Sequence, residues 1–373
     1  MNEIKWLKRL VVLAGLVLVG ALVWQLTKHR AADSAVNSKE VVSIPPHGVA
    51  PSPRPKVESK PAESMAEEGE GEPNTPAVSR EKLDEYLAKH NRSAASLLAG
   101  YHALQDTNLL NEAAAKFPND PYVQWAMLTS EGLGLISEGL DGEQRRQWLE
   151  AFKTSSPNNS LANYLSAADH FKSGNPDAAI KELLNASGKK QFKDFALEAM
   201  IDEQELHRFA GQSAMMAVHA HGWADDLSHQ LVPMKVVANG IAEAQAKYTQ
   251  GGDTTSADDL RQLGFGLADR MDSGDGGKFL LSQMVGAAVE GIMLRNMDSN
   301  TAYESLGGKT PVERQAEMKE QKAEYRKLMP ALSEAYNVLS ESEWVGYSDR
   351  MKAHGELEAL RWLHQRVEAA KAK

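Results

Sequence analysis

The chain has 373 residues, a net charge of −10 at pH 7 and no cysteine. This length gives room for two or three domains and for a sizeable core. The absence of thiols excludes disulfide scaffolds, thiolate metal sites, iron–sulfur clusters and cysteine nucleophiles. The first 30 residues carry five Lys or Arg residues and one Glu, so the rest of the chain carries −14. Such an acidic body argues against nucleic-acid binding, because phosphates are bound by clustered positive charge.

The N-terminal segment is apolar and has basic residues on both sides. It is uncharged from Leu10 to Trp24. Residues 4–26 are long enough to cross about 30 Å of hydrocarbon if the flanking lysines reach the headgroups. A cleaved signal peptide is the alternative, but small residues do not follow the apolar core where a peptidase would cut. We therefore predict an uncleaved signal anchor, a transmembrane helix within residues 1–30.

The orientation of this anchor is less strongly encoded, because the flanking charges almost balance. The basic residues are Lys5, Lys8 and Arg9 before the apolar core, and Lys28, Arg30 and Lys39 after it. A short N-terminal tail usually stays in the cytoplasm, and a long downstream domain is translocated whatever its charge. The prediction is a single-pass inner (plasma) membrane protein with a cytoplasmic N-terminus and an extracytoplasmic (periplasmic) body.

Residues 31–78 have a different composition from the segments on either side. They contain many prolines, few large apolar residues and a short acidic run from Glu67 to Glu72. Proline fixes its own φ and lacks a backbone donor, so such a segment stays extended and solvated. We predict a Pro/Glu-rich disordered linker with a root-mean-square reach of roughly 35–45 Å.

From Ser79 onward the sequence predicts an all-α body of roughly ten to twelve helices. Sustained alternation of β-branched residues, the signal for a sheet, is not found. Several polar residues stand where helix N-caps are expected, before a proline or three residues before an acidic or amide side chain. These positions are Asp120 with Pro121, Asp141 with Gln144, Asn175 with Pro176, Ser256 with Asp259, Thr310 with Pro311 and Glu313, and Ser340 with Glu343.

A repeat is visible in the first half of this body. Two apolar positions three residues apart are followed five residues later by proline. The three units contain Leu110, Ala113 and Pro118; Leu149, Phe152 and Pro157; and Leu183 and Ala186, with Gln191 in place of proline. The third unit is the most complete, and its further positions are Tyr164, Ala167, Ala168, Phe171, Gly174 and Ala179.

With these residues the chain resembles the tetratricopeptide repeat (TPR) family over about residues 93–191. The resemblance implies an α-solenoid of helical hairpins whose concave surface binds peptides or partner proteins, without catalysis of its own. The sequence departs from the pattern of this family in two ways. The second unit has a glycine-rich insertion from Gly132 to Gly142, and the first unit lacks a recognisable first-helix set. The predicted domains are therefore TPR-like repeats over 79–191 and an all-helical region over 192–373 packed on them.

The C-terminal region is predicted to supply a buried helix and an end cap. Gly277–Met297 is apolar but carries charges that argue against a second membrane span, so it is predicted as a buried helix. Val312–Leu339 and Glu343–Lys373 are predicted as a long amphipathic helix pair. The inward stripe of the last helix comprises Trp344, Tyr347, Met351, Leu360, Leu363 and Val367.

Four of the 11 histidines lie close together in sequence, at His207, His219, His221 and His229. On a helix, His219 and His221 would point about 200° apart and could not share a metal. Their surroundings favour a helix end, where histidine interacts well with the dipole and the last carbonyls. A metal site completed by the nearby Asp225 and Asp226 is the alternative.

The Asp272–Lys278 loop resembles two ligand-binding motifs without satisfying either. A phosphate-binding loop would need a glycine where Asp272 stands and a hydroxyl residue where Phe279 stands. A calcium loop would need oxygen ligands where Gly274 and Gly276 stand. We predict a loop in which Asp275 or its neighbours cap the next helix. The sequence assigns no catalytic, cofactor-binding or metal-binding residue.

The function predicted from the sequence is a membrane-anchored TPR-like scaffold in the cell envelope, and not an enzyme. It would present a surface to a protein or peptide partner, without a cofactor and without nucleic acid. One alternative is an architectural envelope protein that self-associates as a homo-oligomer. Another is a metal-dependent envelope enzyme that uses the His207–His229 region.

Overall fold

The computed structural model describes residues 78–372 except 131–141, 221, 275 and 296. The predicted anchor, the predicted linker before residue 78 and Asp141 all lie outside the described residues. Within the described part, none of the helices combines the length and the apolar character that a membrane span requires.

The regular secondary structure of the described part consists of helices alone, which confirms the predicted all-α class. It comprises 16 α-helices and two short 3₁₀ turns, more than the predicted ten to twelve. The α-helices are α2 (Arg80–Lys89), α3 (Ala94–Leu104), α4 (Thr107–Lys116), α5 (Pro121–Thr129), α6 (Gly142–Ser155), α7 (Leu161–Lys172), α8 (Pro176–Ser187), α9 (Ala196–Phe209), α10 (Ala214–Val218), α11 (Gly222–Gln250), α12 (Thr254–Asp272), α13 (Leu280–Leu294), α14 (Pro311–Leu328), α15 (Pro330–Ala335), α16 (Glu341–His354) and α17 (Glu356–Lys371). The 3₁₀ turns are η1 (Gly276–Lys278) and η2 (Glu304–Leu306).

Several helices begin at the predicted caps. The carboxylate of Asp120 accepts from the Tyr122 N–H at 2.8 Å and starts α5. Thr310 and Ser340 each form a complete capping box with the glutamate three residues later. The prediction at Ser256 was wrong, because α12 begins earlier and Asp253 caps it by accepting from the Ser256 N–H at 3.0 Å.

Consecutive helices in the first half pack as pairs. α3 packs on α4, α5 on α6, and α7 on α8, and each pair also contacts the next. The repeat positions Leu110, Phe152 and Leu183 are all buried, with at most 1% of their surface exposed. The apolar pattern read from the sequence therefore marks the sides on which these helices pack.

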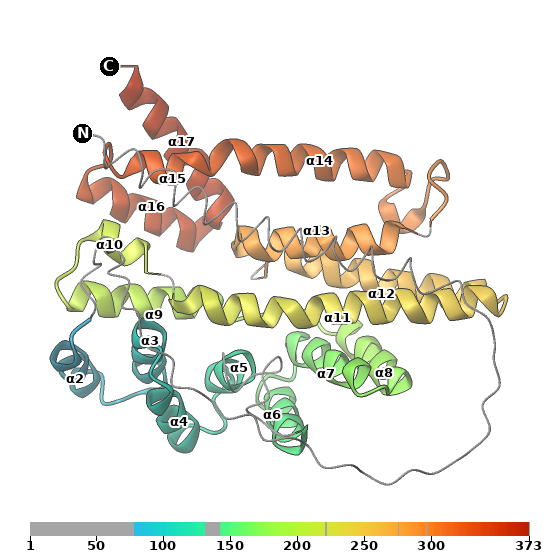
Figure 1. The fold of residues 1–373 in the computed structure, drawn as a ribbon, viewed down its shortest axis with the longest axis horizontal. Helices are drawn as coiled ribbons and strands as arrows, with labels where there is room; N and C mark the ends of the chain where they lie inside the picture. Colours follow the sequence, from blue (N-terminus) through green and yellow to red (C-terminus); the bar gives the residue numbers. More distant parts are fainter. Residues whose placement is uncertain (1–77, 131–141, 221, 275, 296, 373) are drawn as a thin grey trace, which may run out of the picture. The chain divides into compact units, whose positions relative to one another are not determined.

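Helix α11 lies between the paired helices and the C-terminal half (Figure 1). It packs against α3, α5, α7 and α8, and also against α12 and α13. Trp125 of α5 is fully buried, and its Nε1–H donates to Gln230 Oε1 of α11 at 2.8 Å. At Gly240 of α11 an added Cβ would lie 2.6 Å from the ring of Phe171 in α7. The face that α3, α5 and α7 share is thus covered by another part of the same chain.

Arg270 of α12 connects the C-terminal half to the end of α8. Its guanidinium donates to the carbonyl of Ser187 at 3.0 Å and to that of Lys189 at 2.9 Å. These carbonyls lie where the ladder of α8 ends, so they have no partner within that helix. Arg270 therefore acts as a C-terminal cap supplied from a distant element.

Arg270→Ala should lower the free energy of unfolding by about 1–3 kcal/mol, because it leaves helix-end carbonyls without their donor. Arg270→Lys should lose less, since it keeps the charge but not the fork of donors. Urea denaturation of the full-length protein in detergent measures both. Arg326→Ala, which removes an exposed arginine of α14, is the matched control and should change stability by no more than about 0.5 kcal/mol. If Arg270→Ala and Arg326→Ala lowered the free energy of unfolding equally, the capping role of Arg270 would be contradicted.

The predicted C-terminal pair is divided into four helices. Pro330 separates α14 from α15, and Gly355, with φ of +87°, separates α16 from α17. The predicted buried helix is present as α13, but its cap is not a neighbour of Asp275. The Leu280 N–H donates instead to Glu356 Oε2 of α17 at 2.8 Å. The inward stripe is confirmed as buried at Trp344, Tyr347, Met351, Leu360, Leu363 and Val367.

Candidate functional site

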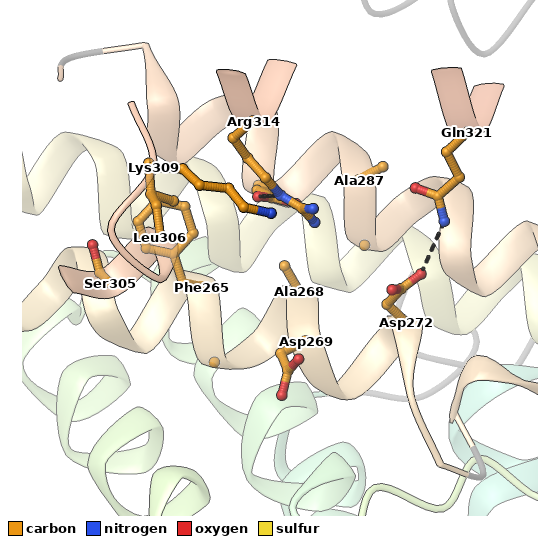
Figure 2. Close-up of a pocket in the computed structure, with 13 residues that line it drawn as sticks. Phe265, Ala268, Asp269, Asp272, Ala287, Ser305, Leu306, Lys309, Arg314 and Gln321 are labelled. Carbon is orange, nitrogen blue, oxygen red and sulfur yellow. Dashed lines mark hydrogen bonds and ion pairs between the residues drawn. The ribbon is translucent and has the colours of Figure 1, made fainter. Parts of the chain in front are cut away.

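A polar cleft lies between α14 and the pair α12–α13, closed at one end by the segment 298–310 (Figure 2). Its volume is about 360 Å³, at the small end of the range for ligand sites. The lining residues are Phe265, Gly266, Ala268, Asp269 and Asp272 of α12, Gly286, Ala287 and Glu290 of α13, Ser305, Leu306 and Lys309 of the closing segment, and Arg314 and Gln321 of α14.

Small residues form the floor of this cleft where α12 meets α13. A Cβ added at Gly286 would lie 3.0 Å from the carbonyl oxygen of Ala268 and 3.1 Å from Met271 Cβ. These distances are too short for an unstrained contact, so glycine permits the close approach of the two helices. Ala268 and Ala287 leave the space above them open on the α14 side.

Ion pairs occupy one part of the cleft wall. The guanidinium of Arg314 donates to both oxygens of Glu290, at 2.5 and 2.9 Å, and to Glu317 at 2.9 Å. The ammonium of Lys309 donates to Glu317 at 2.5 Å, and Figure 2 shows the Lys309 and Arg314 side chains running side by side. The Lys309 and Arg314 hydrogen bonds hold the pKa of Glu317 below its usual value. Both cations are therefore already neutralised by carboxylates.

A chain of hydrogen bonds between carboxylate, amide and hydroxyl groups occupies the other part. Gln321 donates to Asp272 Oδ1 at 3.4 Å, the contact dashed in Figure 2, and to the hydroxyl of Tyr325 at 2.6 Å. The Tyr325 hydroxyl donates in turn to Gln283 Oε1 at 2.7 Å. Burial raises the pKa of Tyr325 to about 12, so this hydroxyl remains a donor at neutral pH. Asp269, one turn before Asp272, is exposed at the cleft.

The arrangement suits recognition of a side chain or a short segment. Its polar groups are held in fixed positions by bidentate pairs and hydrogen bonds, so a partner meets an ordered surface. The cleft is too small to be a whole protein interface, which buries about 800 Å² on each side. It has the dimensions of an anchor pocket within a larger contact.

The structure confirms the predicted helix end at His219. This residue is the C-cap of α10, and its Nδ1–H donates to the carbonyl of Met215 at 2.7 Å. Its ring packs against Tyr336 and Trp344, with centroids 4.3 and 5.0 Å away. The position of His219 is therefore explained by local capping and by aromatic packing.

The other histidines of the predicted group have separate surroundings. His207 Nδ1 lies 2.8 Å from Gln212 Oε1, and its Nε2 lies 3.6 Å from a carboxylate oxygen of Glu203. His229 lies within α11. His221 and the side chains of Asp225 and Asp226 lie outside the described residues. In the part of the chain that is described, no group of three or more His, Cys, Asp or Glu side chains is arranged to hold a metal ion.

Sequence reasoning did not identify the residues of the cleft. The one usable signal was Glu290, an acidic residue inside an otherwise apolar helix whose side chain is only 10% exposed. A buried carboxylate requires a partner, but the sequence does not say that Arg314 provides it. Comparison of the chain with protein-family models, with curated proteins and with solved structures finds no match.

Proposed function

We propose that the helical body is a protein-interaction scaffold, anchored to a membrane by residues 4–26 and displayed outside the cytoplasm. The observation that carries the proposal is the ordered polar cleft beneath α14, with its volume of about 360 Å³. A pocket of this size in a helical surface suits one anchoring side chain of a partner protein. No catalytic residue is assigned.

The proposal places the partner at the cleft and not on the face shared by α3, α5 and α7. The TPR resemblance would favour a surface formed by consecutive first helices, but α11 packs against that side of the paired helices. The cleft, in contrast, opens beside exposed residues such as Ser305 and Asp269. A partner can reach these positions without displacing any buried helix.

Site-specific photo-crosslinking in cells tests this proposal. A photoreactive amino acid is placed at Ser305 or Asp269, two exposed positions at the cleft. The control position is Glu85, an exposed residue of α2. We expect one discrete heterologous product at both cleft positions and none at Glu85. An identical product from all three positions, or no product at either cleft position, would contradict a partner site at the cleft.

Self-association remains a second candidate because of one specific observation. Four large apolar residues are more than a third exposed between α14 and α16, and they are Met329 (45%), Tyr336 (39%), Val338 (38%) and Val345 (42%). Exposed apolar groups that form one contiguous patch are typical of contact surfaces. The same crosslinker placed at Val345 distinguishes the candidates, since a product of twice the chain mass would identify a second copy of this protein.

A further inference from the structure

Helix α14 differs from the other long helices in how little apolar surface it buries. Of its 18 residues only Pro311, Tyr325 and Leu328 are buried, with Met318 packed at the edge of a small apolar cluster. Val312 points into solvent with 53% of its surface exposed. A helix that is polar on nearly all sides derives little stability from burial. Its attachment must therefore come from polar contacts.

Two bidentate ion pairs, on different neighbours, contribute to this attachment beside the Gln321–Asp272 and Tyr325–Gln283 hydrogen bonds. Arg314 donates to both carboxylate oxygens of Glu290 in α13, as described above. Arg361 of α17 donates to both oxygens of Glu324, at 2.7 and 3.0 Å. Figure 1 shows α14 lying along α13 with α17 close to its C-terminal half, and both helices contact it. One ion pair thus holds the helix near its N-terminus, and the other holds it near its C-terminus.

Each pair is open to solvent and salt on at least one side. The side chains of Arg361 and Glu324 are 39% and 38% exposed, whereas in the other pair Arg314 is 31% exposed and Glu290 only 10%. Ion pairs in such positions contribute modestly and are weakened by screening. The contact of α11 with α5, in contrast, is made by fully buried groups such as Trp125. The attachment of α14 is therefore the weaker of the two and the more sensitive to salt.

The two ends of α14 can act as hinges. Gly307 and Gly308, three and two residues before the N-cap Thr310, have φ of +65° and +81°, a region that glycine enters freely. At the other end, Pro330 lacks the N–H that would continue the ladder into α15. Backbone rotation at these two points would move α14 without unfolding it.

We propose that α14 is a salt-sensitive lid, which the Arg314–Glu290 and Arg361–Glu324 pairs hold over the cleft and which swings open when they separate. Opening exposes the floor formed by Gly286 and Ala287. The role of this motion in partner binding rests on the proposed function. The motion itself is a property of the free protein and is measured without any partner.

Hydrogen exchange followed by mass spectrometry, on the full-length protein in detergent, tests the lid. In the wild type we expect the amides of α14 to exchange faster than those of α11. The double variant Glu290→Gln, Glu324→Gln should accelerate exchange of the α14 amides a further fivefold to thirtyfold, roughly the effect of losing two partly exposed pairs. Glu243→Gln, Glu320→Gln removes the same charge from exposed positions without a described ion pair and is the matched control, expected to leave α14 unchanged.

Salt provides the second measurement, which stays decisive if the double variant fails to fold. Raising NaCl from about 0.1 M to about 1 M shortens the screening length from about 10 Å to about 3 Å. We expect wild-type α14 exchange to accelerate while that of α11 does not. Protection of α14 equal to that of α11, with no response to salt, would overturn the lid. This outcome is distinguishable from a failed crosslink at Ser305, which would concern only the partner.

Discussion

Trp125→Ala should lower the free energy of unfolding by about 3–5 kcal/mol, the usual cost of emptying a fully buried tryptophan site. The side chain is fully buried in α5 and donates to Gln230 of α11 at 2.8 Å. Its removal leaves both a cavity and an unpaired amide oxygen in the contact between the paired helices and α11. Trp125→Phe should cost less, because most of the ring volume is kept, although the hydrogen bond and part of the packing are lost.

Chemical denaturation of the full-length protein in detergent measures these losses. Trp362→Ala is the matched control, since Trp362 is only partly buried and its ring contacts the guanidinium groups of Arg350 and Arg366, 5.2 and 5.3 Å from its centroid. Its removal should cost about 1 kcal/mol. If both alanine variants lost the same stability, the special importance of the α5–α11 contact would be refuted.

Asp202→Asn should stabilise the protein at pH 8 by about 2–4 kcal/mol and leave it almost unchanged at pH 4. Burial in α9, together with the neighbouring Glu205 and Glu198, raises the pKa of Asp202 to about 7. Its ordinary value is 3.8, so the folded state binds this proton more tightly than the unfolded state. The contribution of Asp202 to stability is therefore lost as the pH rises from about 4 to about 7. Asparagine carries no charge at either pH and removes this loss.

The measurement is the difference in unfolding free energy between Asp202→Asn and wild type at several pH values. The comparison is needed because His102 acts in the opposite direction. Burial lowers the pKa of His102 to about 4, so its contribution to stability is lost as the pH falls from 6.5 towards 4. Asp349→Asn, at an exposed position of α16, is the control and should show no such trend. A difference for Asp202→Asn that is the same at pH 4 and pH 8 would disprove the assignment.

Local rules explain most of what the sequence predicted correctly. The caps at Asp120, Thr310 and Ser340 depend on residues two or three positions away. The inward stripe from Trp344 to Val367 depends on helical spacing alone. The predicted helix end at His219 likewise depends on its neighbours. Signals within one or two turns are therefore sufficient for the helices and for one face of each.

The candidate site could not be predicted in this way, because its defining contacts join distant residues. Arg314 and Glu290 are 24 positions apart, and Glu356 caps a helix that begins 76 positions earlier. A charged residue in a polar helix gives no sign of which carboxylate it will meet. The division at Gly355 was also missed, since a single glycine inside a helical pattern is often tolerated. Three-dimensional packing decides each of these features.

The position of α11 in the chain has a consequence for synthesis. Helix α5 ends at Thr129, whereas α11 begins at Gly222, so roughly 5–20 s of translation separate them. During that interval the apolar surface around Trp125 has left the ribosome, whereas α11, which covers this surface in the folded protein, has not yet been made. A growing chain in this state offers apolar surface to chaperones and to other nascent chains. Premature termination before Gly222 would therefore produce fragments prone to aggregate, whereas termination after Gln250 would leave that surface covered.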